Sequence, residues 1–501
     1  MVLLVAAAHW YVWRRLVRDT MRRGGWPRRL GTSAVVLLPL LAVATMISER
    51  AEAPMAVQRA LGWPGLMWLA LLLYLLLGLA VGEVVRPVLL RVLERRAQRQ
   101  AAGAAAGGAV RTGGAAGAAP VAEAEREAAV AALAQQVAVT EAADGEPVGG
   151  GGGAGGSGGT GTGAPLRLAP VTGHVDGGGA EGAGAQGAGA GPGGGVQGSG
   201  SGPGSGVAEG PGVGGRAEPA AADVSRRLFV ARTVAVGATA VAAGTVAYGA
   251  YGVLGRAPQV KNVTVPLTKL PASADGYRIA VVSDIHLGPV LGRRHTQRIV
   301  DTINAQRPDL VAIVGDLVDG TVDHLGSAAE PLGQLNARDG SYYVTGNHEY
   351  FAGASGAAEW IDHLRELGLH PLENARTELP GFDLAGVNDV SGEDVGEGPD
   401  FARALGDRDP SRASVLLAHQ PVVIHDAVDH GVDLQLSGHT HGGQLWPVTY
   451  IAKAANPTLA GLERYGDTQL YVTRGAGAWG PPVRVGARSD ITMVRLASPR
   501  A

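Results

Sequence analysis

Five short motifs in the second half of the chain carry the side chains that most often bind metal ions in proteins. In chain order they are Asp284-Ile-His286, Gly315-Asp316, Gly346-Asn347-His348, His419 and Gly438-His439-Thr440-His441. The chain contains no cysteine, which excludes disulfides, thiolate zinc sites and cysteine nucleophiles. Carboxylate, amide and imidazole ligands without thiolate favour Mn, Fe or Zn over Cu(I) or an iron–sulfur cluster. The motifs therefore predict a metal centre of oxygen and nitrogen ligands.

Each motif comes at the end of an apolar run of strand length. These runs cover 277–284, 310–316, 342–347, 413–419 and 433–438, and a sixth run covers 469–475. Helical segments are expected between them, for example at 295–306 and 357–367. This alternation predicts an α/β domain, in which ligands bind beyond the carboxyl ends of the strands. Five such ends that carry aspartate, histidine or asparagine indicate one convergent site.

The order D-x-H, GD-x-x-DG, GNHE, H, GHTH resembles that of the calcineurin-like metallophosphoesterases. Two segments, GHTHGGQ (438–444) and YVTRGAGAWGPPVRVGARSDI (471–491), resemble the membrane-associated bacterial branch of that family. The resemblance covers about half of the chain and implies a four-layer α/β/β/α sandwich. Two features depart from the family pattern, the long Gly-rich linker and Ser489-Asp490-Ile491, where Pro-Glu-Ile is expected.

For the site, the resemblance implies two divalent or trivalent metal ions and one acid. The first ion would be held by Asp284, His286 and His441, the second by Asn347, His419 and His439, and Asp316 would bridge them. His348 would be the acid beside the scissile phosphate. Two cations lower the pKa of a bridging water, so that hydroxide attacks in line without a covalent intermediate.

Other polar and aromatic residues in this half of the chain have more than one possible role. Asp319 and Glu349 are expected to support the site or a turn rather than to bind metal. Trp446 and Trp479 either line the site, reach the lipid interface or belong to the core. Surface or core roles are expected for His295, His324, His363, His370, His425 and His430. Asn374 either belongs to a turn or orients a neighbour of the site, and Arg293 and Arg294 either form a solvated face or contact the substrate phosphate.

Uncharged apolar runs in the first hundred residues predict a membrane region, 1–100, with about three transmembrane helices. The runs at 34–48 and 66–82 have enough length with their flanks, whereas the opening run at 2–13 is short. Three arginines follow the opening run rather than precede it, the reverse of a signal peptide. Residues 225–256, with Ser225-Arg226-Arg227 before an uncharged run, predict a fourth transmembrane helix or a twin-arginine-type signal anchor.

Between these parts, residues 101–224 are a low-complexity Gly/Ala-rich segment that predicts a disordered linker. Such a sequence cannot bury enough apolar surface to offset the entropy of ordering its backbone. Tethering is its expected role, with docking of a partner as the alternative. Residues 257–501 then form the metallophosphoesterase domain.

The distribution of arginine predicts the orientation in the membrane. The segments 14–30 and 86–99 are rich in arginine and are expected on the cytoplasmic side, while 49–62 is expected outside. Four spans then place the linker inside and the C-terminal domain outside the cytoplasm. Nucleic-acid binding is not expected, because residues beyond the first hundred carry a net charge of −12.

The leading hypothesis is thus a multi-pass protein of the cell membrane whose extracytoplasmic domain is a metal-dependent phosphohydrolase. Its substrate would be a phosphomonoester, phosphodiester or pyrophosphate, lipid-linked or from the cell envelope. The alternative is a non-catalytic membrane sensor or scaffold that binds a ligand without turnover. A transporter is weakly supported, because the apolar runs hold almost no charge deep inside them.

Overall fold

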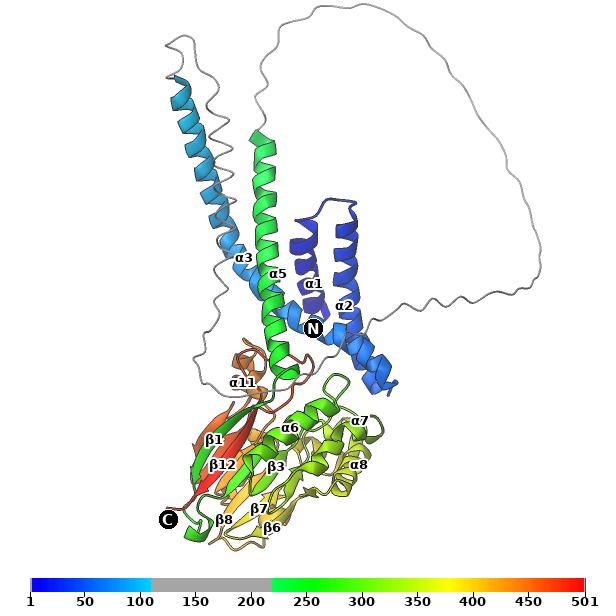
Figure 1. Ribbon diagram of the computed structural model, residues 1–501, viewed down its shortest axis with the longest axis vertical. Helices are drawn as coiled ribbons and strands as arrows, with labels where there is room; N and C mark the ends of the chain where they lie inside the picture. The colour runs from blue at the N-terminus through cyan, green and yellow to red at the C-terminus, as the bar shows by residue number, and fades with distance from the viewer. Residues whose placement is uncertain (1, 110–218, 500) are drawn as a thin grey trace, which may run out of the picture. The chain divides into compact units, whose positions relative to one another are not determined.

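The computed structural model describes residues 2–109, 219–499 and 501 (Figure 1). Most of the expected linker, 101–224, lies outside these residues. Before it come α1 (Val2–Trp13), which continues as the π-helical turn η1 (Arg14–Arg18), α2 (Trp26–Arg50) and α3 (Met55–Ala109), and after it comes α5 (Pro219–Leu254). Helix α3 therefore runs nine residues into the region predicted as linker, where the sequence is rich in alanine.

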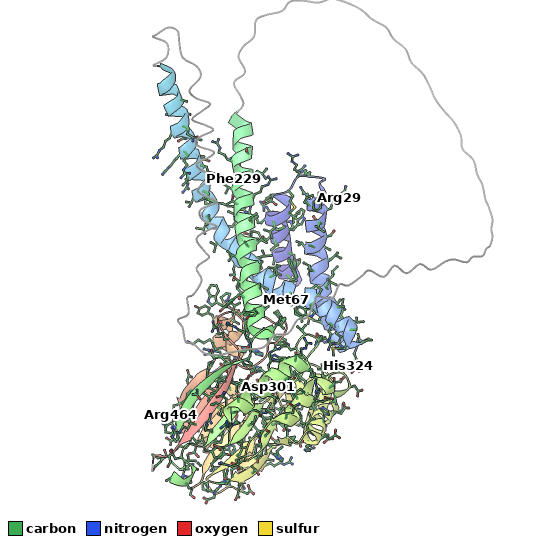
Figure 2. All side chains as sticks on the ribbon, viewed as in Figure 1. Arg29, Met67, Phe229, Asp301, His324 and Arg464 are labelled. Carbon is green, nitrogen blue, oxygen red and sulfur yellow. The ribbon has the colours of Figure 1, made fainter. Side chains whose placement is uncertain are left out.

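Within the described residues, three helices are long and apolar enough to cross a membrane: Trp26–Arg50, Met55–Ala104 and Ser225–Leu254. Helix α1 has 12 residues, fewer than the roughly 20 that span a bilayer. Small residues let α3 and α5 approach closely, because a Cβ added at Gly78 would lie 3.2 Å from that of Ala238. Figure 2 shows Met67 on α3 and Phe229 on α5. The apolar helices predicted from the sequence are thus present, while the four-span arrangement stays a prediction.

The C-terminal region contains two six-stranded sheets. The first has the order β1 (Gln259–Pro266), β12 (Asp490–Ala497), β2 (Arg278–Val282), β3 (Leu310–Val314), β4 (Ser341–Val344) and β5 (His370–Pro371). The second has the order β10 (Gly461–Tyr465), β11 (Thr468–Val472), β9 (Leu434–Ser437), β8 (Ala413–Leu417), β7 (Phe382–Gly386) and β6 (Ala375–Leu379). Strands β2, β3 and β4 are parallel, as are β7, β8, β9 and β11.

Helices cover the outer face of each sheet. On the first sheet lie α6 (Arg293–Gln306), α7 (Val322–Ala329) and α8 (Gly353–Glu366), and on the second lie α9 (Phe401–Leu405) and α10 (Ile424–Asp429). Shorter turns of helix connect them: η2 (Ala272–Ala274), η3 (Glu330–Gln334), η4 (Glu349–Ala352), η5 (Val390–Val395), η6 (Pro421–Val423), η7 (His441–Gly443) and α11 (Thr449–Ala455). The four layers confirm the α/β/β/α sandwich expected from the sequence.

Alternation along the strands explains why both faces of each sheet are buried. In β2, Val281 joins the cluster between the two sheets, whereas its neighbours Ala280 and Val282 join the cluster under α6 to α8. Because successive strand residues point to opposite faces, a strand buried on both sides reads as a continuous apolar run. The run at 310–314, LVAIV, shows this pattern most clearly, and each of the six runs predicted as strands contains a strand in the structure.

Candidate metal centre

The loops that follow β2, β3, β4, β8 and β9 bring all eight predicted site residues together. Asp284 and His286 follow β2, Asp316 follows β3, and Asn347 and His348 follow β4. His419 follows β8, while His439 and His441 follow β9. The carboxyl ends of these strands lie in two facing sheets, so the loops of both sheets close over one site.

The first group of ligand atoms belongs to Asp284, His286 and His441, which are all buried. The Nε2 atoms of His286 and His441 are 3.0 Å apart, and His441 Nε2 is 3.4 Å from Asp284 Oδ1. Two imidazole nitrogens and a carboxylate oxygen directed at one point fit a divalent cation.

The second group consists of Asp316, His419 and His439, and Asn347 joins it. The side-chain oxygen of Asn347 lies 2.9 Å from Nδ1 of His439 and 3.2 Å from Nε2 of His419. The residues of this group come from both sheets. The nitrogen of His419 that faces away from the group, Nδ1, lies 2.9 Å from the carbonyl oxygen of Val314, which fixes its ring.

Asp316 lies between the two groups. Its Oδ2 is 3.7 Å from Nε2 of His286 and 3.2 Å from Nε2 of His419. Its Oδ1 accepts a hydrogen bond from the backbone N–H of His348, which orients the carboxylate. Asp316 is therefore placed as a ligand shared by two ions would have to be.

Five of the seven predicted ligands have a left-handed backbone. The φ angles are +51° at Asp284, His286 and His441, +50° at Asp316 and +68° at His439. This conformation is uncommon outside glycine, although aspartate and histidine tolerate it better than most residues. Backbone strain of this kind concentrates at functional sites, where the surrounding structure holds it in place.

Two glycines allow the loops to approach this closely. A Cβ at Gly346 would lie 2.3 Å from the backbone nitrogen of Asp316, and one at Gly438 would lie 1.8 Å from the hydroxyl oxygen of Ser283. Both contacts are far below van der Waals distance. The glycines in the GN and GH motifs are thus required by the approach of one ligand loop to another.

Asp319 is a part of the site whose role the sequence left open between turn and support. Its Oδ1 is 2.8 Å from Nδ1 of His286 and 2.7 Å from Nδ1 of His348. It therefore holds the ring of His286, a predicted ligand, by a hydrogen bond, and it lies within ion-pair distance of Nδ1 of His348, the predicted acid. Its position in the GDLVDG segment, three residues after Asp316, is the sequence signal for this role.

Glu349 supports the loops rather than the metal ions. Its carboxylate accepts hydrogen bonds from the backbone N–H groups of Asp316, Leu317 and Gly346, at 3.2, 2.7 and 2.6 Å. These bonds fasten the loop after β3 to the loop after β4. The supporting role expected for Glu349 agrees with these contacts.

Arg484 is a buried residue of the site that the sequence analysis missed. Its guanidinium donates to Nδ1 of His441 at 3.0 Å and to the carbonyl oxygens of His441 and Gly477 at 3.2 and 2.6 Å. Burial lowers the pKa of Arg484 to about 10, so the side chain stays charged at neutral pH. It lies in the segment 471–491 that resembles the family, but nothing in the stretch PPVRVG marks this arginine as part of the site.

The charges of the centre shift its histidines in opposite directions. Burial lowers the pKa of the His286 imidazole, but Asp319, Asp316 and Asp284 outweigh burial and raise the pKa to about 9. Burial and the nearby His419 lower the pKa of His439 to about 4. The carboxylates therefore attract positive charge, which a proton supplies on His286 and which a metal ion would supply in its place.

A cavity of about 500 Å³ opens beside the centre. Its polar lining includes Asp316, Asn347, His348, His439 and His441. Its apolar lining includes Phe351, Leu445, Val448, Trp479 and Pro481. A cavity of this size takes a small phosphorylated molecule or the head of a larger one.

The remaining predicted residues lie elsewhere. Arg293 pairs with Glu330 on the outside of the first sheet, as expected for a solvated face. The side-chain oxygen of Asn374 accepts from the backbone N–H groups of Asn388 and Asp400, which is a turn role. His295 is buried in α6 and belongs to neither group of ligand atoms.

The sandwich and its grouped aspartate, asparagine and histidine side chains define a metal-dependent phosphoesterase domain. The family model of calcineurin-like phosphoesterases matches residues 277–443. An uncharacterized metallophosphoesterase from Aquifex aeolicus is 33% identical over 243 residues, which cover 48% of this chain and 91% of the relative. The chain therefore belongs to the calcineurin-like phosphoesterases, and its family implies divalent metal ions.

Two vertebrate relatives also match about half of the chain. Each is called a transmembrane protein with metallophosphoesterase domain. The one from Danio rerio is 41% identical over 267 residues, or 50% of this chain and 61% of the relative. The one from Bos taurus is 38% identical over 292 residues, or 55% of this chain and 64% of the relative. The alignments thus span less than two thirds of either relative. With the three apolar helices, they support membrane association.

Proposed function

We propose that this protein is a membrane-anchored phosphohydrolase that uses two metal ions to cleave a phosphomonoester, phosphodiester or pyrophosphate bond. The observation that carries the proposal is the position of Asp316 between two groups of ligand atoms. Asp284, His286 and His441 would hold one ion, and Asn347, His419 and His439 the other. Both divalent and trivalent ions suit this donor set, with Mn, Fe or Zn expected.

The chain's own residues would bind and protonate the substrate. Bound metal ions would supply activated water and neutralise phosphate oxygens. His348 lines the cavity, and its Nε2 lies 3.9 Å from Oδ2 of Asp316. This position supports a role in which His348 would give a proton to the leaving oxygen. Asp319 beside its Nδ1 would orient the ring for that transfer.

We also infer that the domain lies outside the cytoplasm, on a multi-pass anchor. The arginine-rich segments 14–30 and 86–99 support this orientation, and Figure 2 shows Arg29 in the first turn of α2. Arg59, in the segment expected outside, donates to the carbonyl oxygen of Pro289 in the domain. Protease added to intact spheroplasts should remove the domain, and protection until lysis would contradict the orientation.

The substrate would be a phosphorylated molecule of the membrane or cell envelope. The anchor supports this choice, because it keeps the site beside the bilayer. The alternative of a sensor or scaffold predicts metal binding and ligand binding without turnover.

The decisive experiment uses the full-length protein in detergent, stripped of metal and then titrated with Mn²⁺. We expect hydrolysis of bis-p-nitrophenyl phosphate that rises with bound Mn²⁺ and is lost on addition of a chelator. Absence of turnover over a broad panel of phosphoesters, in protein shown to hold two metal ions, would reject the phosphohydrolase and favour the sensor.

A further inference from the structure

The segment 446–451 follows η7 and includes the first turn of α11, and it presents apolar side chains to the surface. Tyr450 and Ile451 are 68% and 70% exposed, and Trp446 and Val448 are also exposed. Helix α11 buries none of its residues. Large apolar side chains that gather on a surface in this way mark a site of contact with another apolar body.

The same surface borders the mouth of the metal cavity. Val448 lines the cavity, as do the exposed rings of Phe351 and Trp479. The ring centroids of Phe351 and Trp479 lie 4.2 and 5.6 Å from that of His348, the proposed acid. We call the set Phe351, Trp446, Val448, Tyr450, Ile451 and Trp479 the apolar rim.

The rim is continuous with the apolar helices. The hydroxyl of Tyr74, on α3, donates a hydrogen bond to the carbonyl oxygen of Trp446 at 3.0 Å. Leu445, next to Trp446, packs into the cluster that also contains Leu75 of α3 and Ala250 of α5. The contact therefore joins the rim to two helices that are long enough to span a bilayer.

A short connection keeps the domain at the end of α5. Four residues, 255–258, separate Leu254 at the end of α5 from Gln259 at the start of β1. Fully extended, this connection reaches about 18 Å between the Cα atoms of those two residues. The domain therefore stays within reach of the bilayer surface if α5 spans it.

The chemistry of the rim matches the lipid interface rather than a charged protein partner. Tryptophan and tyrosine are the residues enriched where a membrane meets water. The stretch 444–456 contains Lys453 and no acidic residue, and lysine favours anionic head groups. An acidic residue here would be repelled by such a surface.

We propose that the apolar rim inserts into the interfacial layer of the membrane that α3 and α5 cross. The cavity then receives amphiphilic phosphoesters, whose apolar tails stay in the bilayer while their phosphate reaches the metal centre. The statement about substrate rests on the proposed phosphohydrolase function, whereas the statement about membrane contact does not.

Membrane contact is tested in the full-length protein reconstituted in phosphatidylcholine and phosphatidylglycerol vesicles. Because the chain has no cysteine, Ile451→Cys carries a single thiol for a fluorescent label. Val422→Cys is the matched control, since Val422 is also an exposed apolar residue, in η6. We expect doxyl-labelled lipid to quench the label at 451 and not at 422. Equal quenching at the two positions would overturn the proposal.

Substrate choice is tested with two esters that differ in their tails alone, p-nitrophenyl ethyl phosphate and p-nitrophenyl hexadecyl phosphate in mixed micelles. The double variant Tyr450→Glu with Ile451→Glu would place two negative charges against the lipid. We expect its turnover of the hexadecyl ester to fall about tenfold. Turnover of the ethyl ester should be unchanged, as should both activities of Val422→Glu. Equal losses on both esters would overturn the amphiphile assignment. If the unsubstituted protein cleaves neither ester, the proposed function fails while the quenching result still decides the membrane contact.

Discussion

The carboxylate of Asp319 lies 2.7 Å from Nδ1 of His348. The proposed acid is therefore paired with an anion that belongs to neither predicted ligand set. A carboxylate at this distance restricts which way the ring faces. The same oxygen also approaches His286, so one side chain aligns the acid with a ligand.

We expect His348→Asn to reduce turnover about 10² to 10⁴ times, the usual contribution of a general acid. The loss should be smaller for p-nitrophenyl esters, whose leaving group needs no proton, than for alkyl esters. Asp319→Asn should show the same dependence on leaving group in weaker form. A loss that is equal for both kinds of ester would contradict the role of His348 as acid.

Asp316→Asn should lower metal content as well as activity. The amide cannot supply two negatively charged oxygens, so the bridge between the ligand groups would be lost. We expect elemental analysis after dialysis to find about half of the wild-type metal per chain or less, in proportion to the two ligand groups. Asp301→Asn, on the exposed side of α6 (Figure 2), is the control and should retain its metal. Wild-type metal content in Asp316→Asn would reject the bridging role.

Arg484→Met should weaken metal binding about 10 to 100 times, because partners behind a ligand commonly contribute that much. The substitution removes the donor that holds Nδ1 of His441. Titration of the stripped protein with Mn²⁺ measures the effect, and Arg484→Lys should restore part of it. Arg464→Met, at the exposed edge strand β10, should bind Mn²⁺ as the wild type does. If Arg484→Met does so too, Arg484 acts on the fold alone.

His295 should make the protein less stable in mild acid. Burial and then the nearby Arg298 lower the pKa of His295 to about 3 in the folded state. The unfolded chain takes up this proton below about pH 6.5, so folding loses about 1.4 kcal/mol per pH unit from there down to the folded pKa.

The measurement is the midpoint of thermal unfolding in detergent between pH 7.5 and 5. We expect His295→Phe to be less sensitive to acid than the wild type. His425→Phe, at an exposed histidine, should follow the wild type. Parallel curves for His295→Phe and the wild type would show that another group causes the acid sensitivity.

The predicted residues of the centre could be read from the sequence because each follows a short strand that is rich in apolar residues and buried along almost its whole length. A parallel strand such as β3, with the sequence LVAIV, has no polar position until it ends. The first polar side chain after it, that of Asp316, thus marks the edge of the sheet where a site forms. The sandwich fold was predictable for the same reason together with the family resemblance.

Other parts of the molecule carry no comparable signal in the sequence. Strand β1 has the sequence QVKNVTVP and is half exposed at the edge of its sheet. It therefore contains too few apolar residues to be predicted as a strand. The role of Arg484 depends on the loop before β12 folding back to His441, a contact between residues 43 positions apart. Trp446 and Trp479 had several readings because exposure of an aromatic side chain is decided by tertiary packing.

The left-handed backbone at five of the predicted ligands has a consequence for how the centre can change. A replacement at one of these positions changes both the metal-binding atom and the ability of the residue to adopt a positive φ. A β-branched residue such as valine would remove the metal-binding atom and would also disfavour the positive φ. Glycine would lose the donor but relax the main chain. Mutational drift away from catalysis should therefore tend toward glycine at these positions, leaving a sandwich that folds more readily than its active ancestor.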